Sequence, residues 1–263
     1  MSPSLAVVLC VLGAAGAFVS GLVGVGGAIV MIPLLLYGPP LLGVGALDVK
    51  AVAAISMVQV FVAALSGVLA HRRHQAVNRR LALVGGPAMA AGSLLGAVAS
   101  KYVGDRWLLL VFAAMVTAAF VVMLLPEPPP DPAEPAAVKE YSAPLTAVTA
   151  FGVGLAAGFV GAGGAFLLVP LLLVVVGVPI RVTIGSSLAI TTVAATAGVL
   201  GKAVTGQIPL SPAAVVAAGA LPGAQLGAAA SRRLSGVALK RALLVVIVLT
   251  GLKVWSDVLL GRR

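Results

Sequence analysis

Two long runs without charge constrain this chain more than any other feature of its sequence. Residues 1–47 and 141–180 contain no Asp, Glu, Lys or Arg. About 20 apolar residues cross the ~30 Å hydrocarbon layer of a membrane, and both runs exceed that length. Because 61% of the 263 residues are hydrophobic and 9% are charged, a soluble core cannot accommodate the sequence. We therefore expect an all-α polytopic membrane protein.

Each run contains the same glycine-rich stretch, 137 positions apart. Residues 21–36 read GLVGVGGAIVMIPLLL, and residues 158–173 read GFVGAGGAFLLVPLLL. This repetition indicates internal duplication. Glycine costs about 1 kcal/mol relative to alanine inside a helix, so the stretches predict interrupted helices. Inside a membrane such a break has to be buried by protein or face a water-filled cavity.

Charged residues divide the sequence into eight apolar blocks: 5–37, 47–70, 81–100, 107–125, 144–178, 182–204, 211–231 and 242–260. Six have the length of one span. The first and fifth, with roughly 33 residues, would extend ~50 Å as helices and must tilt, break or turn back. A proline-rich acidic linker at 126–143 separates a first transmembrane repeat at 1–125 from a second at 144–263. Each repeat is expected to have a broken or hairpin first element plus three transmembrane helices.

The distribution of basic residues favours inverted repeats. The segment 71–80 is strongly basic and its counterpart has only Lys202, whereas one loop later the bias is reversed and 232–241 is the denser segment. Inverted repeats place equivalent loops on opposite faces, so that both dense segments are cytoplasmic and both termini periplasmic. Eight simple crossings are the alternative and leave 232–241 outside, while the inverted arrangement leaves Arg262–Arg263 outside.

Helix N-termini at the predicted breaks are candidate anion sites. Helices that begin near Gly27 and Gly164 expose N–H groups and a positive dipole end, which attract anions. The alternative is that small residues simply permit close helix packing. Lys50 and Arg181 stand at equivalent block entrances, where they draw in an anion or extend toward lipid headgroups.

Polar residues inside the spans are the remaining candidates. Ser187 and Thr191 can share one helix face, although such hydroxyls commonly bond to their own helix. Gln59 and Gln225 are costlier to bury and favour cavity lining or helix contacts. The predicted substrate-binding residues are Gly24, Gly26, Gly27, Gly161, Gly163, Gly164, Ser56, Gln59, Ser187, Thr191, Gln225, Lys50 and Arg181.

Several function classes lack their sequence signature. All seven carboxylates lie in loops, in the linker or near span ends, so a mid-membrane Asp or Glu relay is missing. The GxGxxG pattern of dinucleotide-binding proteins fails at Ile29. We expect no catalytic residues, no metal site, no cofactor and no enzyme activity. The net charge of +10 fits membrane orientation better than nucleic-acid binding, so the expected partners are the lipid bilayer and a small anion.

The duplicated motif, the two four-block halves and the acidic linker resemble the TauE/SafE family, also described as the toluenesulfonate uptake permease family. The resemblance covers essentially the whole chain. It implies an inner-membrane permease that moves sulfite, organosulfonates or other sulfur-containing anions, often outward. An anion channel and a non-transporting membrane scaffold subunit are the alternatives, and counterflow and reconstitution of the chain alone distinguish them.

Overall fold

The structure, a computed structural model, describes residues 1–23, 27–71, 77–125, 141–231 and 233–260. These residues form ten α-helices and one short 3-10 helix, with no strand among them. The first half contains α1 (Pro3–Val23), α2 (Ala28–Leu41), α3 (Val49–His71), α4 (Arg79–Ala99), η1 (Ser100–Tyr102) and α5 (Asp105–Leu124). The second half contains α6 (Ala143–Val160), α7 (Ala165–Val174), α8 (Ile180–Val204), α9 (Leu210–Ser231) and α10 (Gly236–Leu260).

The helices confirm the all-α expectation. Within the described ranges, seven are long and apolar enough to cross a membrane: α1, α3, α4, α5, α6, α8 and α9. The 14-residue α2 and the 10-residue α7 are shorter. At 1.5 Å per residue they extend only about 21 and 15 Å, less than the ~30 Å of a hydrocarbon layer. Each long apolar block therefore folds as a spanning helix followed by a shorter one.

Both glycine-rich stretches interrupt a helix, as their composition predicts. Gly161, Gly163 and Gly164 lie between α6 and α7 and all have positive φ. Gly27, with φ of 73°, immediately precedes α2. This left-handed conformation is strained for residues that carry a Cβ. Gly16 faces Met31, and Gly38 faces Leu12, so α1 and α2 form an antiparallel hairpin.

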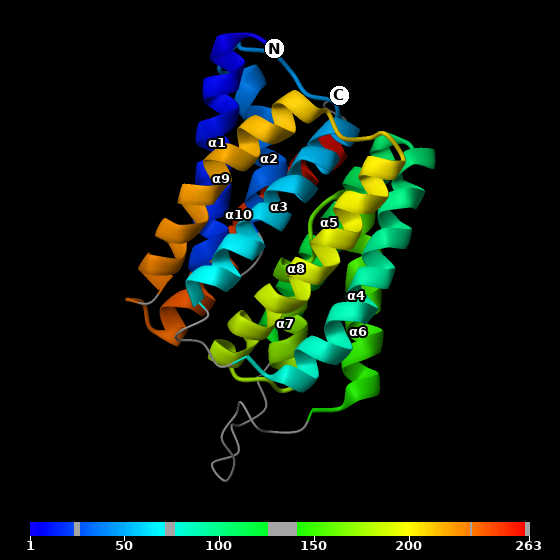
Figure 1. Cartoon of the computed structure of the whole chain (residues 1–263), viewed down its shortest axis with the longest axis vertical. Coiled ribbons are helices and arrows are strands. Elements are labelled where there is room, and N and C mark those ends of the chain that lie inside the picture. The colour runs from blue at the N-terminus through cyan, green and yellow to red at the C-terminus, as the bar shows by residue number, and fades with distance from the viewer. Residues whose placement is uncertain (24–26, 72–76, 126–140, 232, 261–263) are drawn as a thin grey trace.

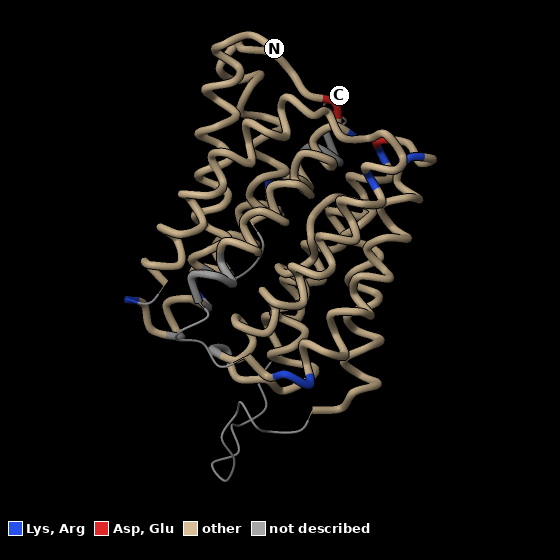
Figure 2. The backbone as a smooth tube through the Cα atoms, viewed as in Figure 1, with Lys and Arg blue, Asp and Glu red and all other residues tan. Residues whose placement is uncertain are grey.

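The two halves interleave in the bundle (Figure 1). Helices α3 and α8 lie side by side in the middle, with α1 and α9 packed together on one side and α4 and α6 on the other. Helices α5 and α10 contact each other, and they also contact α7 and α2, respectively. One end of the bundle holds the beginning of α1 and the end of α10, and α6 begins at the other end. Most Lys and Arg lie near helix ends (Figure 2).

Two glycine-lined seams join the halves. On one seam, Gly92 and Gly96 of α4 lie against the backbone of α6, and Gly154 and Gly158 of α6 lie against the backbone of α4. The other seam joins α1 and α9 through Gly13 and Gly21 on one side and Gly219, Gly223 and Gly227 on the other. Small residues four apart allow helix backbones to approach closely within membranes. These seams fix the rotation of the outer helices around α3 and α8.

Replacing Gly154 by valine is expected to destabilise the fold markedly. A Cβ at this position meets the carbonyl of Met89, a backbone group that cannot move aside as a side chain can. Overpacking of this kind costs about 1–3 kcal/mol. Gly152→Val is the matched control, because Gly152 is exposed and a Cβ there meets nothing within 4 Å. Thermal unfolding in detergent should show a lower midpoint for Gly154→Val only. Equal midpoints for the two variants would contradict close packing of α6 on α4 at this glycine.

Candidate functional site

Two consecutive residues of α3, Gln59 and Val60, lie beside the two glycine breaks. A Cβ built on Gly27 would lie 3.1 Å from Gln59 Nε2 and 3.0 Å from Ser20 Cβ. A Cβ built on Gly163 would collide with Val60, the residue after Gln59. Gly161 lies against the backbone carbonyl of Ala53 on the same helix. The glycine breaks, 137 positions apart in sequence, are therefore held within reach of the middle of α3.

Buried polar side chains without protein partners occur around this point. Gln59 is 0% exposed, and within the part of the chain that the structure describes neither its Oε1 nor its Nε2 has a hydrogen-bond partner. The same holds for hydroxyls from four other residues, which with Gln59 are named here the central polar set: Ser20, Ser56, Gln59, Ser93 and Thr191. Each unsatisfied buried group costs about 1–3 kcal/mol. Several such groups in an apolar bundle are costly for packing and suit the binding of a polar ligand or water.

The central polar set comes from four helices. Ser56 lies one turn before Gln59 on α3, so both can share a face. Ser93 Oγ of α4 lies near Gly198 of α8, since a Cβ built on Gly198 would be 2.7 Å from it. Thr191 lies two turns before Gly198 on α8. Because α8 packs on both α3 and α4, the set crosses from one half to the other.

The electrostatics of this region favour an anion. No side chain caps the N-terminus of α2 or of α7, and both helices begin at the breaks. Their first N–H groups have no intrahelical acceptor and carry the positive end of the helix dipole. The amide of Gln59 adds a donor next to Gly27. Helices α1 to α4 and α6 to α9 contain no Asp or Glu that would repel an anion.

Several predicted site residues belong to this region. Gly27, Gly161, Gly163 and Gly164 form the described parts of the breaks, and Ser56, Gln59 and Thr191 are fully buried with unpartnered polar atoms. Gly24, Gly26 and the side chain of Arg181 lie outside the described residues.

Three other predicted residues do not belong to the central polar set. Ser187 is buried, but its Oγ donates to the carbonyl of Ile184 in its own helix at 3.0 Å, which was the alternative reading of this serine. Gln225 is exposed on α9. Lys50 lies nine residues before Gln59, about 13 Å along a helix, and its Nζ donates to the carbonyl of Lys101 at 3.0 Å.

The structure adds residues that sequence reasoning missed. Ser20 and Ser93 complete the central polar set, and each is an isolated hydroxyl in an apolar helix. Ser20 stands four residues before Gly24, and Ser93 follows the seam residue Gly92. A hydroxyl shortly before a predicted break, or beside a glycine that permits close helix packing, was the signal that could have identified these two residues.

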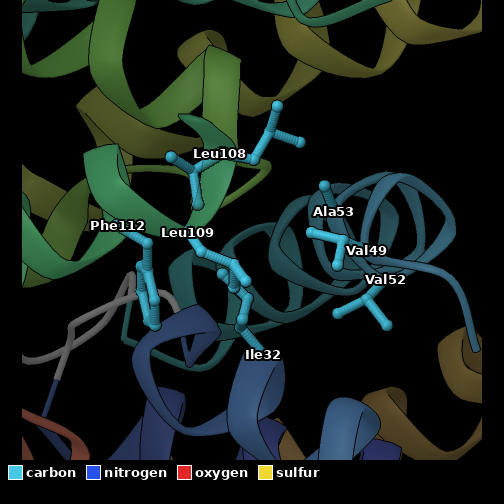
Figure 3. A pocket seen from close by; sticks show the side chains of 8 residues that line it. Ile32, Val49, Val52, Ala53, Leu108, Leu109 and Phe112 are labelled. Carbon is cyan, nitrogen blue, oxygen red and sulfur yellow. The ribbon is translucent and has the colours of Figure 1, made fainter. Parts of the chain in front are cut away.

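An apolar cavity of about 10 Å³ lies beside the second break, between α2, α3, α5 and the end of α6 (Figure 3). Its lining is wholly hydrophobic: Ile32, Val49, Val52, Ala53, Leu108, Leu109, Phe112 and Val160. A cavity of this size and lining has no polar partner for a water molecule or an ion. The candidate site is therefore the central polar set with the two breaks, and not this cavity.

Comparison with known proteins identifies related chains. A family profile described as "Sulfite exporter TauE/SafE" matches residues 9–254. The "Probable membrane transporter protein YunE" of Bacillus subtilis (strain 168) is 27% identical over 262 residues, which cover 93% of this chain and 95% of the relative. A "Probable membrane transporter protein" of Xylella fastidiosa (strain Temecula1) is 32% identical over 171 residues, with 65% and 64% coverage. No solved structure matches the chain.

Proposed function

Because this chain belongs to the TauE/SafE family of membrane transporters, we propose that it is a secondary transporter for small sulfur-containing oxyanions. Its proposed substrates are sulfite and organosulfonates, and its proposed direction is export. The chain is a multi-pass membrane protein with seven apolar helices of spanning length among its described residues. A site near the middle of the bundle fits the way broken helices of secondary transporters bind anions.

The observation that carries this proposal is the buried carboxamide of Gln59 beside the N-terminus of α2. An oxyanion between the breaks would accept hydrogen bonds from Gln59 Nε2, from hydroxyls of the central polar set and from the first N–H groups of α2 and α7. Such donors act strongly in a site that excludes water. Hydrogen bonds to a charged acceptor contribute about 1.5–3 kcal/mol each, so a few of them can replace the hydration of a small anion.

The flux test separates the proposed carrier from its alternatives. Purified full-length protein in proteoliposomes is assayed with sulfite, sulfate, thiosulfate, sulfoacetate and taurine. A carrier takes up labelled substrate faster when the liposomes are preloaded with unlabelled substrate, whereas a channel does not. A scaffold subunit gives no flux by itself. Accelerated exchange of sulfite or a sulfonate supports the proposal, and its absence for every sulfur anion contradicts it.

We further propose that the two halves are inverted repeats. By their order in each half, α1 is equivalent to α6 and α4 is equivalent to α9. The contact of α1 with α9 therefore corresponds to the contact of α6 with α4. Helices α1 and α6, which are equivalent, begin at opposite ends of the bundle (Figure 1). Equivalent basic segments then lie on opposite faces of the membrane, which agrees with their opposite bias.

Reporter fusions test this arrangement. A reporter after Arg263 and a reporter inserted within residues 72–80 are expected on opposite faces, with the first in the periplasm. The physical reason is that the strongly basic 71–80 segment favours the cytoplasm. Paired alkaline phosphatase and green fluorescent protein fusions give opposite activity patterns at the two faces. Detection of both positions in the cytoplasm would rule out the inverted topology.

A further inference from the structure

Lys202 is a fully buried cation in the last turn of α8. Its Nζ donates to Ser100 Oγ at 2.9 Å and to Gln207 Oε1 at 3.4 Å. The amide nitrogen of Gln207 donates to the carbonyl of Ala97 at 3.0 Å, so these groups hold one another where α4 and α8 end. An ammonium has three N–H groups. In the described part of the chain, these two oxygens are its acceptors, which leaves one donor for a further group.

The charge of Lys202 is not balanced by a carboxylate in the described part of the chain. Lys50 is a second cation nearby, since its Nζ contacts Lys101, the residue after Ser100. Asp48 is exposed, and its carboxylate accepts from the backbone N–H of Lys50 at 3.2 Å. The dipole at the end of α8 favours a cation, but it offsets less than the cost of taking an ammonium out of water.

We propose that Lys202 is the charged centre of an oxyanion-binding site at this end of the bundle, on the route to the central polar set. An oxyanion would accept the remaining N–H of Lys202 and neutralise a charge that the protein leaves unpaired. Lys50 adds long-range attraction for an approaching anion. The identity of the anion as a sulfur oxyanion rests on the proposed function.

The site exists at one end of the bundle. Helices α4 and α8 both end where α1 begins (Figure 1). Beyond the glycine stretches the halves align at a spacing of 131, at which Gly67-Val-Leu falls on Gly198-Val-Leu. At this spacing Lys202 corresponds to His71 and Gln207 corresponds to Ala76. The repeat therefore encodes no second copy of this pair of side chains, which the second half contributes and Ser100 of the first half holds.

Lys202→Met is the test variant. Methionine has a similar length, and Ser100 Oγ and Gln207 Oε1 lie 3.0 Å apart, so they can bond to each other without the lysine. Replacing a buried ion by an apolar residue is often neutral for stability. The matched control is Lys101→Met, which removes an exposed cation from the same end. Unfolding midpoints in detergent verify that each variant is folded, and Lys202→Gln is a second variant with a neutral polar side chain.

The first readout is equilibrium binding of sulfite to the purified full-length protein by calorimetry. We expect Lys202→Met to remove one sulfite site per chain, or to weaken it at least about tenfold, as the loss of a charged hydrogen bond predicts. Lys202→Met is expected to cause the same loss of sulfite binding in a protein that already carries Gln59→Leu. Lys101→Met should leave binding within about twofold of wild type. Equal binding by wild type, Lys202→Met and Lys202→Gln would overturn the inference.

The second readout is transport kinetics. An access site acts on substrate that arrives at its own end of the bundle. For substrate supplied at that face, Lys202→Met should therefore lower kcat/KM about tenfold and change kcat less than twofold. A loss of kcat with unchanged KM would overturn the role in access. Binding also separates this inference from the proposed function. If the wild type binds sulfite through Lys202 but transports no sulfur anion, the proposed function fails and the Lys202 site stands.

Discussion

Replacing Gln59 by leucine is expected to lower substrate exchange by about a hundredfold, while Gln225→Leu leaves exchange within about twofold of wild type. Gln59 is 0% exposed and lies beside the first break, whereas Gln225 is exposed on α9. Leucine has a similar volume and no donor. A hundredfold loss corresponds to about 2.7 kcal/mol, which is near the upper end for one hydrogen bond to a charged group.

Stability separates this effect from misfolding. The amide of Gln59 has no partner in the described part of the chain, and replacing an unsatisfied buried group by an apolar one is neutral or stabilising. The Gln59→Leu variant should therefore unfold at the same temperature as wild type or higher, although it does not transport. Counterflow and unfolding are measured on the same preparations. Normal exchange by folded Gln59→Leu would exclude Gln59 from the substrate site.

The main features of the fold followed from the sequence because they depend on composition and spacing. The charge-free runs predict membrane helices, and the clustered glycines predict the interruption at residues 161–164, where α6 ends and α7 begins. The spacing of charges predicted the other six blocks. Five of them agree with one observed helix to within two residues, and the block at 242–260 lies within α10, which begins six residues earlier. The packing of α1 on α9 did not follow, because the apolar residues of these helices show no preferred face from which a neighbour could be inferred.

The site was harder to predict because burial of a polar residue depends on the rotation of its helix. Gln59 and Gln225 had the same sequence argument, yet one is buried and the other is exposed. On α9 the spacing of the glycines indicates which face is buried, because Gly223 and Gly227 face α1. A residue two positions from each of them points away from that seam at 100° per residue.

Lys202 illustrates a different limit of sequence reasoning. In a membrane sequence, carboxylates within the spans predict an ion relay, whereas lysines near span ends predict orientation. Lys202 lies near the end of an apolar block, where a long side chain normally reaches the headgroups. Here Ser100, which is distant in sequence, and Gln207, five residues further along the chain, provide oxygens that hold it inside. Contacts between residues 102 positions apart leave no local pattern.

The second large effect is expected from adding a single methyl group at the first break. Gly27→Ala should lower exchange at least about tenfold, because its Cβ would lie 3.1 Å from Gln59 Nε2 and 3.0 Å from Ser20 Cβ, where the substrate is proposed to bind. The left-handed conformation adds a backbone cost of about 1–2 kcal/mol for any residue with a Cβ. A loss of flux caused by the volume of the added methyl group has to be distinguished from a loss caused by this backbone strain.

Gly206→Ala makes that distinction. Gly206 has φ of 71°, close to the 73° of Gly27, but a Cβ at Gly206 meets nothing within 4 Å. Both alanine variants bear the same backbone strain, but Gly27→Ala should lose more free energy of unfolding than Gly206→Ala, because its Cβ also lies 2.5 Å from the backbone carbonyl oxygen of Gly16. Only Gly27→Ala should lose exchange. Gly164→Ala is also expected to lose exchange and stability, since its Cβ meets the Cβ of Ala157 at 2.8 Å besides side-chain atoms of Met89 and Val153. Exchange by Gly27→Ala equal to that by Gly206→Ala, with both variants folded, would show that the first break is not part of the substrate path.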